Sequence, residues 1–149
     1  MATAGADPVF VDTNILIYAN VAAAPEHQTA RTRLHELANL GAELWVSRQV
    51  FREYLAVLTR PQMFTKPIAP ADLVLDVQRF ERQFRVAEDG PAVTVNLLDL
   101  LKTIAIGGKQ VHDANIVATM EAHGLRHLLT HNVADFQRFA SRIVVIPLL

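Results

Sequence analysis

The stretch Val9-Phe10-Val11-Asp12-Thr13-Asn14-Ile15-Leu16 sets the fold that we expect for the whole chain. Its first three residues are apolar and β-prone, which predicts a short buried strand that ends at Asp12. A helix is expected over 13–20, where apolar residues recur at helical spacing. Because ligands of open α/β sheets bind at the carboxyl ends of the strands, Asp12 would point into that crevice. Asp12 could equally be the N-cap of the helix, since Asp is a common cap.

Outward from this stretch, the chain alternates short apolar runs with helical periods. Further strands are expected at 43–46, 84–86, 127–130 and 143–146. Helices are expected from Pro25 to Gly41, from Ser47 to Pro61, over 71–83, from Pro91 to Gly107, over 112–123, and briefly around Phe136. Strands separated by helices, without a hairpin signal, predict an α/β fold with a central parallel sheet and helices on both faces.

The composition indicates one compact domain. With 149 residues the chain has the length of about one domain, and we expect 1–149 to form it. Hydrophobic residues make up 51% and charged residues 19%, which argues against intrinsic disorder. The absence of cysteine excludes disulfides, thiolate catalysis and cysteine-ligated metals, and it fits a reducing cytoplasm.

The N-terminus and the net charge bear on where the protein is located and on how it could bind nucleic acid. Residues 1–8 carry no basic residue and no apolar core, so we expect no signal peptide. No apolar run reaches the ~20 residues of a membrane span. We therefore expect a soluble, cytoplasmic protein with no membrane partner. The formal net charge is −1, so nucleic acid would have to be bound at a local site and not by a globally basic surface.

Two further carboxylates share helix faces that are otherwise apolar. Glu53 lies on the face of Val50 and Val57, and Asp113 lies on the face of Ile116. A carboxylate in an apolar stripe must be desolvated, paired or metal-bound. The plainer alternatives are a solvent-exposed edge or an arginine partner for Glu53, and a favourable interaction with the helix dipole for Asp113.

A polar cluster, Thr130-His131-Asn132-Val133-Ala134-Asp135, follows directly on the expected strand at 127–130. Asn132 and Asp135 both offer oxygen atoms as metal ligands. Either could instead cap the short helix around Phe136, and we expect at least one of them to do so.

Asp12, Glu53, Asp113 and the polar cluster at 130–135 could meet at one end of the sheet. Carboxylates placed together repel and raise one another's pKa, and a divalent cation removes that repulsion. Ligands that are all oxygen select Mg²⁺ or Mn²⁺ over zinc. Clustered acids that hold Mg²⁺ suit hydrolysis of a phosphodiester, because metal ions activate water and stabilise the leaving oxygen.

The same residues resemble the motifs of a known nuclease family. Residues 9–16 resemble the opening motif of PIN-domain nucleases. The later motifs have counterparts in the same order and at similar spacing: Glu53, His112-Asp113-Ala114 with Ile116, and Thr130-His131-Asn132 with Asp135-Phe136. The resemblance covers essentially the whole chain. The size of the chain and its lack of extra domains resemble the toxin half of VapBC-type toxin–antitoxin pairs.

The resemblance implies a PIN-like three-layer sandwich and a metal-dependent endoribonuclease whose site is blocked by an antitoxin. It assigns the metal, and with it catalysis, to Asp12, Glu53 and Asp113. The fourth metal position matches Asn132, Asp135 or both. One or two Mg²⁺ ions would therefore be bound, with Mn²⁺ as a substitute.

The resemblance also implies residues that support the metal site. Thr13, Asn14 and Thr130 match positions that would hydrogen-bond the carboxylates.

Basic residues near these motifs are candidates for contacts with RNA. Lys109 lies in a glycine-containing loop, where it could meet a backbone phosphate or simply be an exposed lysine. His112 could donate to a phosphate or a leaving group, although a capping or supporting role is the simpler interpretation. Arg48 and Arg52 are weaker candidates for phosphate contacts, and His131 is expected to be merely exposed.

Partner surfaces and one rival function remain open. Helices over 30–40 and 50–58 could leave a groove for an antitoxin helix, and the resemblance also favours a homodimer. The rival to the enzyme is a PIN-like module that has lost catalysis and only binds RNA or a protein. The presence of Asp12, Glu53 and Asp113 argues against that rival.

Overall fold

Five parallel strands form the centre of the protein. In the computed structural model, which describes residues 6–149, they lie in the order β3-β2-β1-β4-β5. Their bounds are Val9–Val11 for β1, Leu44–Ser47 for β2, Arg85–Ala87 for β3, His127–Thr130 for β4 and Val144–Pro147 for β5. Every pair of neighbouring strands is parallel, as the alternation of strands and helices predicts.

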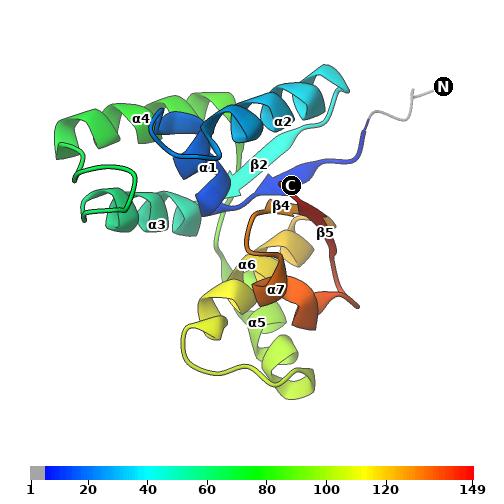
Figure 1. The fold of residues 1–149 in the computed structure, drawn as a ribbon. Helices are drawn as coiled ribbons and strands as arrows, with labels where there is room; N and C mark the ends of the chain where they lie inside the picture. The colour runs from blue at the N-terminus through cyan, green and yellow to red at the C-terminus, as the bar shows by residue number, and fades with distance from the viewer. Residues whose placement is uncertain (1–5) are drawn as a thin grey trace.

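Helices cover both faces of this sheet (Figure 1). One face carries α1 (Thr13–Asn20), α2 (His27–Asn39), α3 (Arg48–Leu58) and α4 (Pro70–Gln83). The other face carries α5 (Pro91–Thr103), α6 (Gln110–Ala122) and α7 (Val133–Phe136), which continues into a short 3-10 helix, Gln137–Phe139. The predicted three-layer α/β arrangement is therefore confirmed.

The strand order changes direction at the centre of the sheet. From β1 the chain moves outward through β2 to β3, and it then crosses back to β4 and β5 on the other side of β1. Val11 pairs with Leu129, and the N–H of Asp12 donates to the carbonyl of Leu129 at 3.0 Å. Such a switch leaves a crevice at the carboxyl ends of the two central strands. Asp12 and Thr130 lie next to each other at this crevice.

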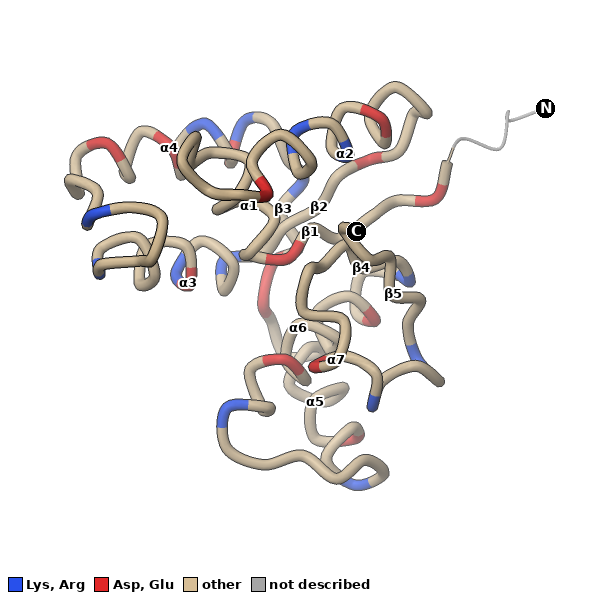
Figure 2. The backbone as a smooth tube through the Cα atoms, viewed as in Figure 1, with Lys and Arg blue, Asp and Glu red and all other residues tan. Residues whose placement is uncertain are grey.

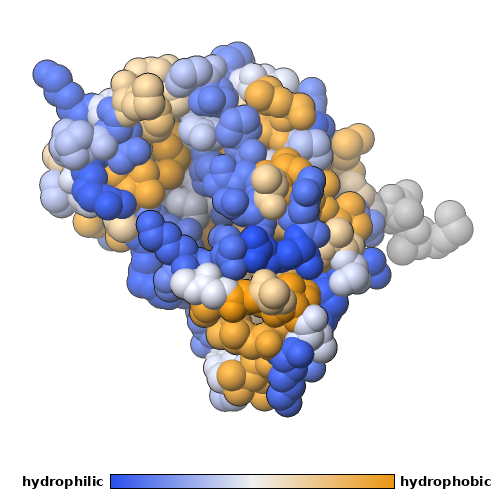
Figure 3. Space-filling model, turned by 60° about the horizontal axis from the view of Figure 1, so that its bottom comes forward, coloured by the Kyte–Doolittle hydropathy of each residue, from blue (hydrophilic) through white to orange (hydrophobic). Residues whose placement is uncertain are grey.

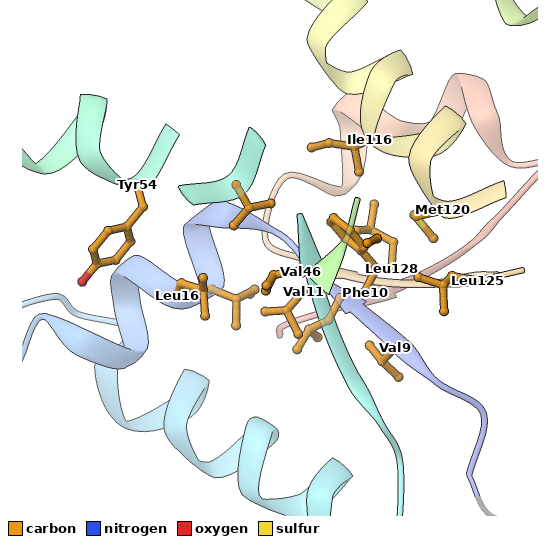
Figure 4. Close-up of a cluster of buried hydrophobic side chains, with 14 of the residues drawn as sticks. Val9, Phe10, Val11, Leu16, Val46, Tyr54, Ile116, Met120, Leu125 and Leu128 are labelled. Atoms are coloured by element: carbon orange, nitrogen blue, oxygen red, sulfur yellow. The ribbon is translucent and has the colours of Figure 1, made fainter. Parts of the chain in front are cut away.

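The central strand is buried on both faces, which explains its uninterrupted apolar sequence. Val9, Phe10 and Val11 are each at most 3% exposed. Figure 4 shows them packed between helices of both layers, with Leu16 of α1 on one side and Ile116 of α6 on the other. Burying an aliphatic or aromatic side chain of this size contributes about 1.5–3 kcal/mol. The shared core therefore fixes the helices on both sides of the crevice.

Local sequence signals set several helix ends. Ser47 caps α3, because its hydroxyl accepts a hydrogen bond from the Val50 N–H at 3.4 Å. Pro70 and Pro91 open α4 and α5, where a backbone N–H is not needed. The end of α6 is followed by Gly124, whose φ of +69° favours glycine.

Several of the predicted boundaries are wrong by one to a few residues, among them the limits of β2, β5 and α5. Phe84 ends α4 and does not begin β3, α2 begins at His27 and not at Pro25, and α6 begins at Gln110 and not at His112. Helix ends depend on local hydrogen bonds that the spacing of apolar residues does not specify.

The surface mixes charges and hydrophobic groups. Figure 2 shows basic and acidic residues interspersed along the backbone, in keeping with the net charge of −1. Figure 3 shows hydrophilic side chains across the middle of one face and hydrophobic side chains below them. Within residues 6–149, every helix is too short or too polar to cross a membrane.

Candidate active site

Polar side chains from both helical layers line a cleft of about 880 Å³ at the carboxyl ends of the central strands. They come from α1, α3 and α6 and from the segments next to β1, α3, β4 and α6. The polar lining includes the three carboxylates expected from the sequence, Asp12, Glu53 and Asp113. The other polar residues that line the cleft are Thr13, Asn14, Gln49, Arg52, Arg60, Lys109, His112, Asn115 and Asn132. Residues far apart in the sequence thus meet at the edge where the strand order predicts a ligand site.

Asp12 is held firmly at the end of β1 and is only 5% exposed. Its Oδ1 accepts the N–H of Thr13 at 2.8 Å, and its Oδ2 accepts the Thr130 hydroxyl at 2.8 Å and Asn14 Nδ2 at 3.1 Å. Burial, and to a smaller degree the charge of Glu53, raises the pKa of Asp12 to about 6, although the hydrogen bonds oppose the rise. Asp12 is therefore both the N-cap of α1 and a carboxylate of the cleft.

Glu53 projects from α3 into the same cleft and is half-buried. Its Oε1 accepts a hydrogen bond from Gln49 Nε2 at 2.8 Å, and its Oε2 accepts one from the Thr13 hydroxyl at 3.3 Å. Among the ion pairs of residues 6–149 none involves Glu53, so the expected alternative of an arginine partner is wrong.

Asp113 reaches the cleft from the first turn of α6. Its side chain is half-buried, and burial is the main reason why its pKa rises to about 6. The negative charges of Asp135, Asp12 and Glu53 raise the pKa further toward that value, and Arg138 opposes them. The helix dipole favours a carboxylate at this position, but burial and repulsion outweigh it.

Thr130 and Asn14 connect the ends of the two central strands behind Asp12. Thr130 is fully buried, and its hydroxyl accepts the N–H of Asn132 at 3.0 Å while it donates to Asp12. Asn14 Oδ1 accepts the N–H of His131 at 3.0 Å. Both side chains therefore fix the orientation of the Asp12 carboxylate.

Asn132 and Asp135 lie in different places. Asn132 lines the cleft and stands at the N-cap position of α7, where its side chain forms no capping hydrogen bond. Asp135 is exposed in the first turn of α7, and the cleft lining does not include it, although its charge acts on Asp113. The expectation that Asn132 or Asp135 caps this helix through its side chain is thus wrong. Of the two residues, Asn132 is the one whose side chain could offer an oxygen ligand in the cleft.

Cationic side chains lie along one part of the cleft. Lys109, Arg52 and Arg60 are exposed and line it. Arg48 does not line it, because its guanidinium forms ion pairs of 2.6 and 2.9 Å with Glu81 and Glu88. Arg48 was therefore wrong as a candidate phosphate contact, and Arg60 is the cation that no motif indicated.

The two histidines of the motifs differ in their surroundings. The cleft lining includes His112, whose backbone carbonyl accepts a hydrogen bond from Gln49 Nε2 at 2.8 Å. His131 is half-buried and not merely exposed as expected. Its ring packs edge-on against Tyr18 with centroids 5.5 Å apart, and its Nε2 lies 3.9 Å from a carboxylate oxygen of Glu26. His131 therefore packs against α1 and the segment before α2.

Gln49 and Asn115 line the cleft although no motif indicated them. Asn115 Nδ2 donates to Gln49 Oε1 at 2.8 Å. Gln49 precedes Glu53 by four positions, which is one helical turn on the same face, and that spacing is the signal that could have identified it.

The donor set of the cleft suits a hard divalent cation. Asp12, Glu53, Asp113 and Asn132 offer only oxygen atoms, which Mg²⁺ and Mn²⁺ prefer. Within residues 6–149, no three Asp, Glu or His side chains stand close enough together to surround one ion as they are. The raised pKa values of Asp12 and Asp113 show, however, that burial and repulsion destabilise the charged carboxylates, and a cation relieves both effects.

Comparison with known proteins identifies the family. The sequence model of the PIN domain matches residues 9–141, which include every cleft residue named above. The chain belongs to the PIN-domain family. Ribonuclease VapC24 of Mycobacterium tuberculosis is 31% identical to this PIN domain over 131 residues, which cover 87% of this chain and 89% of the relative. Ribonuclease VapC48 of the same organism is 29% identical over 133 residues, with 86% and 89% covered.

Solved structures share the fold of this PIN domain. VapBC2 from Rickettsia felis, bound to a DNA fragment from its promoter, gives a TM-score of 0.66 at 17% identity and covers 93% of this chain and 97% of that one. VapC20 of Mycobacterium tuberculosis, described as a sarcin-ricin loop cleaving toxin, gives a TM-score of 0.64 at 20% identity, with 91% and 96% covered. At these identities the likeness shows the fold alone.

Proposed function

We propose that this PIN domain is a metal-dependent endoribonuclease that hydrolyses phosphodiester bonds of RNA, with Mg²⁺ as its cofactor and Mn²⁺ as a substitute. The observation that carries the proposal is the meeting of Asp12, Glu53 and Asp113 in one cleft. The pKa values of Asp12 and Asp113 are raised to about 6, as expected for clustered acids whose charge a bound cation would neutralise. The names of the ribonuclease relatives VapC24 and VapC48 support the reaction.

Each carboxylate would have its own part in holding the cation. Asp12 is the fixed ligand, because three hydrogen bonds orient it. Glu53 is oriented through both oxygens, by Gln49 and by the Thr13 hydroxyl, whereas the Asp113 carboxylate accepts no hydrogen bond within residues 6–149. Asn132, which follows β4, adds a neutral oxygen atom to the cleft. Bound there, the cation would activate water and stabilise the charge that develops on the phosphate.

The cationic part of the cleft would hold the RNA backbone. Lys109, Arg52 and Arg60 are exposed there, so phosphates can reach them. His112 lines the same cleft and would contact the RNA or support the neighbouring Asp113. A local cationic site of this kind reconciles RNA binding with the net charge of −1.

The protein would be the toxin of a VapBC-like pair, with a VapB-like antitoxin as its partner. The solved VapBC2 structure named above supports this partner class. Of the two helices expected to form the antitoxin groove, the helix over 30–40 lines a groove and the helix over 50–58 does not, since α1 packs against both α2 and α3. This groove, of about 680 Å³, lies along α1, α2 and α4, and it would accept an antitoxin segment.

We also propose that residues 1–149 act as a single domain in the cytoplasm and pair with a second copy of the chain. Val95, Leu98 and Leu101 form an exposed apolar row on α5 that a second copy would cover. Light scattering at micromolar concentration tests this pairing, and replacing Leu98 with Asp should give a monomer.

Cleavage of RNA in the presence of Mg²⁺ or Mn²⁺ tests the proposed activity. We expect cleavage that EDTA stops and that Asp113→Ala abolishes. Cleavage that withstands both controls would indicate a contaminating nuclease. A folded protein that binds RNA but never cuts it would be the inactive binding module considered above.

A further inference from the structure

Gln49 is a nearly buried amide that joins the two helical layers across the cleft. Only 7% of the residue is exposed. Its Nε2 donates to Glu53 Oε1 and to the carbonyl of His112, both at 2.8 Å, and its Oε1 accepts Asn115 Nδ2 at 2.8 Å. Because a carboxylate and a carbonyl can only accept, these partners fix which atom of the amide is the nitrogen.

This amide is the direct polar link between α3 and α6. The two helices lie on opposite faces of the sheet, where α3 packs on α1 and α6 packs on α5 (Figure 1). Within residues 6–149, each hydrogen bond that joins α3 to α6 involves Gln49. The peptide bond of the His112 carbonyl leads to Asp113, so Gln49 connects one carboxylate of the cleft to the backbone that carries another.

We propose that Gln49 is a positioning residue that sets the separation between Glu53 and Asp113 and so the affinity of the cleft for a divalent cation. This inference rests on the proposed function. The two carboxylates approach from different layers, so any movement of one layer against the other changes their separation. Removing a polar group that orients metal ligands typically weakens metal binding about 10–100-fold.

Asn115 completes the link. Its donation to Gln49 Oε1 satisfies the last hydrogen-bonding atom of a buried amide, which would otherwise be costly to bury. It lies on α6 two residues after Asp113 and also lines the cleft. The amide of Gln49 is thereby held at α6 by two bonds and at Glu53 by one.

The test is Mn²⁺ binding to the protein without RNA, measured by isothermal titration calorimetry. Gln49→Met keeps the shape of the side chain and removes its hydrogen bonds, and we expect the Kd for Mn²⁺ to rise about tenfold. Asn115→Ala leaves both donations of Gln49 in place, and we expect a rise of about threefold. With RNA present, Gln49→Met should shift the Mn²⁺ concentration that gives half-maximal cleavage by the same factor as the Kd.

Asn96→Leu is the matched control. Asn96 Nδ2 donates to the carbonyl of Ala118 at 3.1 Å, so it also joins two helices through an amide, but it does not line the cleft. We expect it to lower the melting temperature and to leave the Kd for Mn²⁺ within about twofold of wild type.

The outcomes separate this inference from the proposed function. A wild-type protein that does not bind Mn²⁺ overturns both. A wild-type protein that binds Mn²⁺, with Gln49→Met binding it equally well, overturns the positioning role alone. Equal weakening in Asn96→Leu also overturns that role, because the effect would then be general loosening. If Gln49→Met does not fold, an unchanged Kd in Asn115→Ala decides against the inference.

Discussion

The two sides of the cleft hold their carboxylates in opposite ways. Asp12 is 5% exposed and accepts three hydrogen bonds from its surroundings. Asp113 is half-buried, and within residues 6–149 its carboxylate accepts no hydrogen bond. Burial raises the pKa of both, but hydrogen bonds oppose the rise at Asp12, whereas neighbouring acids add to it at Asp113. Asp12 thus contributes both to the stability of the fold and to the site, while Asp113 contributes to the site alone.

The largest expected effect is the loss of cleavage in Asp113→Asn. Removing a ligand charge should lower kcat for RNA cleavage at least ~1000-fold, which corresponds to ~4 kcal/mol of transition-state stabilisation. Circular dichroism should show an intact fold, because the carboxylate has no partner within the described residues. Cleavage within tenfold of wild type would exclude Asp113 from the site.

A smaller loss is expected for Thr130→Val, which removes the hydroxyl that donates to Asp12 at 2.8 Å. The carboxylate would lose a fixed orientation and its pKa would rise, so we expect about tenfold slower cleavage and a lower melting temperature. Thr130→Ser, which keeps the hydroxyl, is the control and should retain most activity. Equal activity of the valine and serine variants would contradict the idea that Asp12 depends on its neighbours.

A weaker effect still is expected where RNA meets the cleft. Arg52→Ala should raise KM for RNA about threefold to tenfold and leave kcat nearly unchanged, since it removes only a phosphate contact. Arg48→Ala is the matched control on the same helix, because its guanidinium is already paired with Glu81 and Glu88. Equal KM values for the two variants would place the RNA elsewhere.

The smallest expected effect is on thermal stability, and we expect it to differ between Asp113 and Asp12. Folding raises the pKa of Asp113 from 3.8 to about 6, so protonation of Asp113 stabilises the folded state. This contribution to the free energy of unfolding is fully present below the pKa of the unfolded chain and is lost as the pH rises through about 6. Asp113→Asn should therefore raise the melting temperature near pH 7.5 by about 2 °C, allowing for solvent screening, and by nothing below about pH 3.

Asp12→Asn should not share this gain, because an amide cannot accept all three hydrogen bonds that reach the carboxylate. Melting curves across this pH range compare the two variants directly. The same stabilisation in both would show that their surroundings do not differ as described.

Much of the fold could be predicted because each element has a local signal. The apolar run at 9–11 and the cap at Ser47 mark a strand and a helix directly. Placing Glu53 and Asp113 at one cleft followed from their helix faces together with the family motifs. What could not be predicted depends on which neighbours meet in space: Arg48 is taken by two glutamates, and His131 packs on Tyr18.

Gln49 shows the same limit within the site. Its distance of four residues from Glu53 was visible, but its bonds to the His112 carbonyl and to Asn115 depend on how two layers pack across the sheet. A single sequence does not specify that packing, because the residues lie more than sixty positions apart.

The most direct measurement of the central claim is calorimetric titration of Mn²⁺ into the wild-type protein and into four acid variants. We predict that the wild type binds and that Asp12→Asn, Glu53→Gln and Asp113→Asn each weaken binding at least about tenfold. Asp135→Asn should bind within about threefold of wild type, since Asp135 does not line the cleft. No binding by the wild type, or equal weakening by Asp135→Asn and Asp113→Asn, would contradict a cation site built from these three carboxylates.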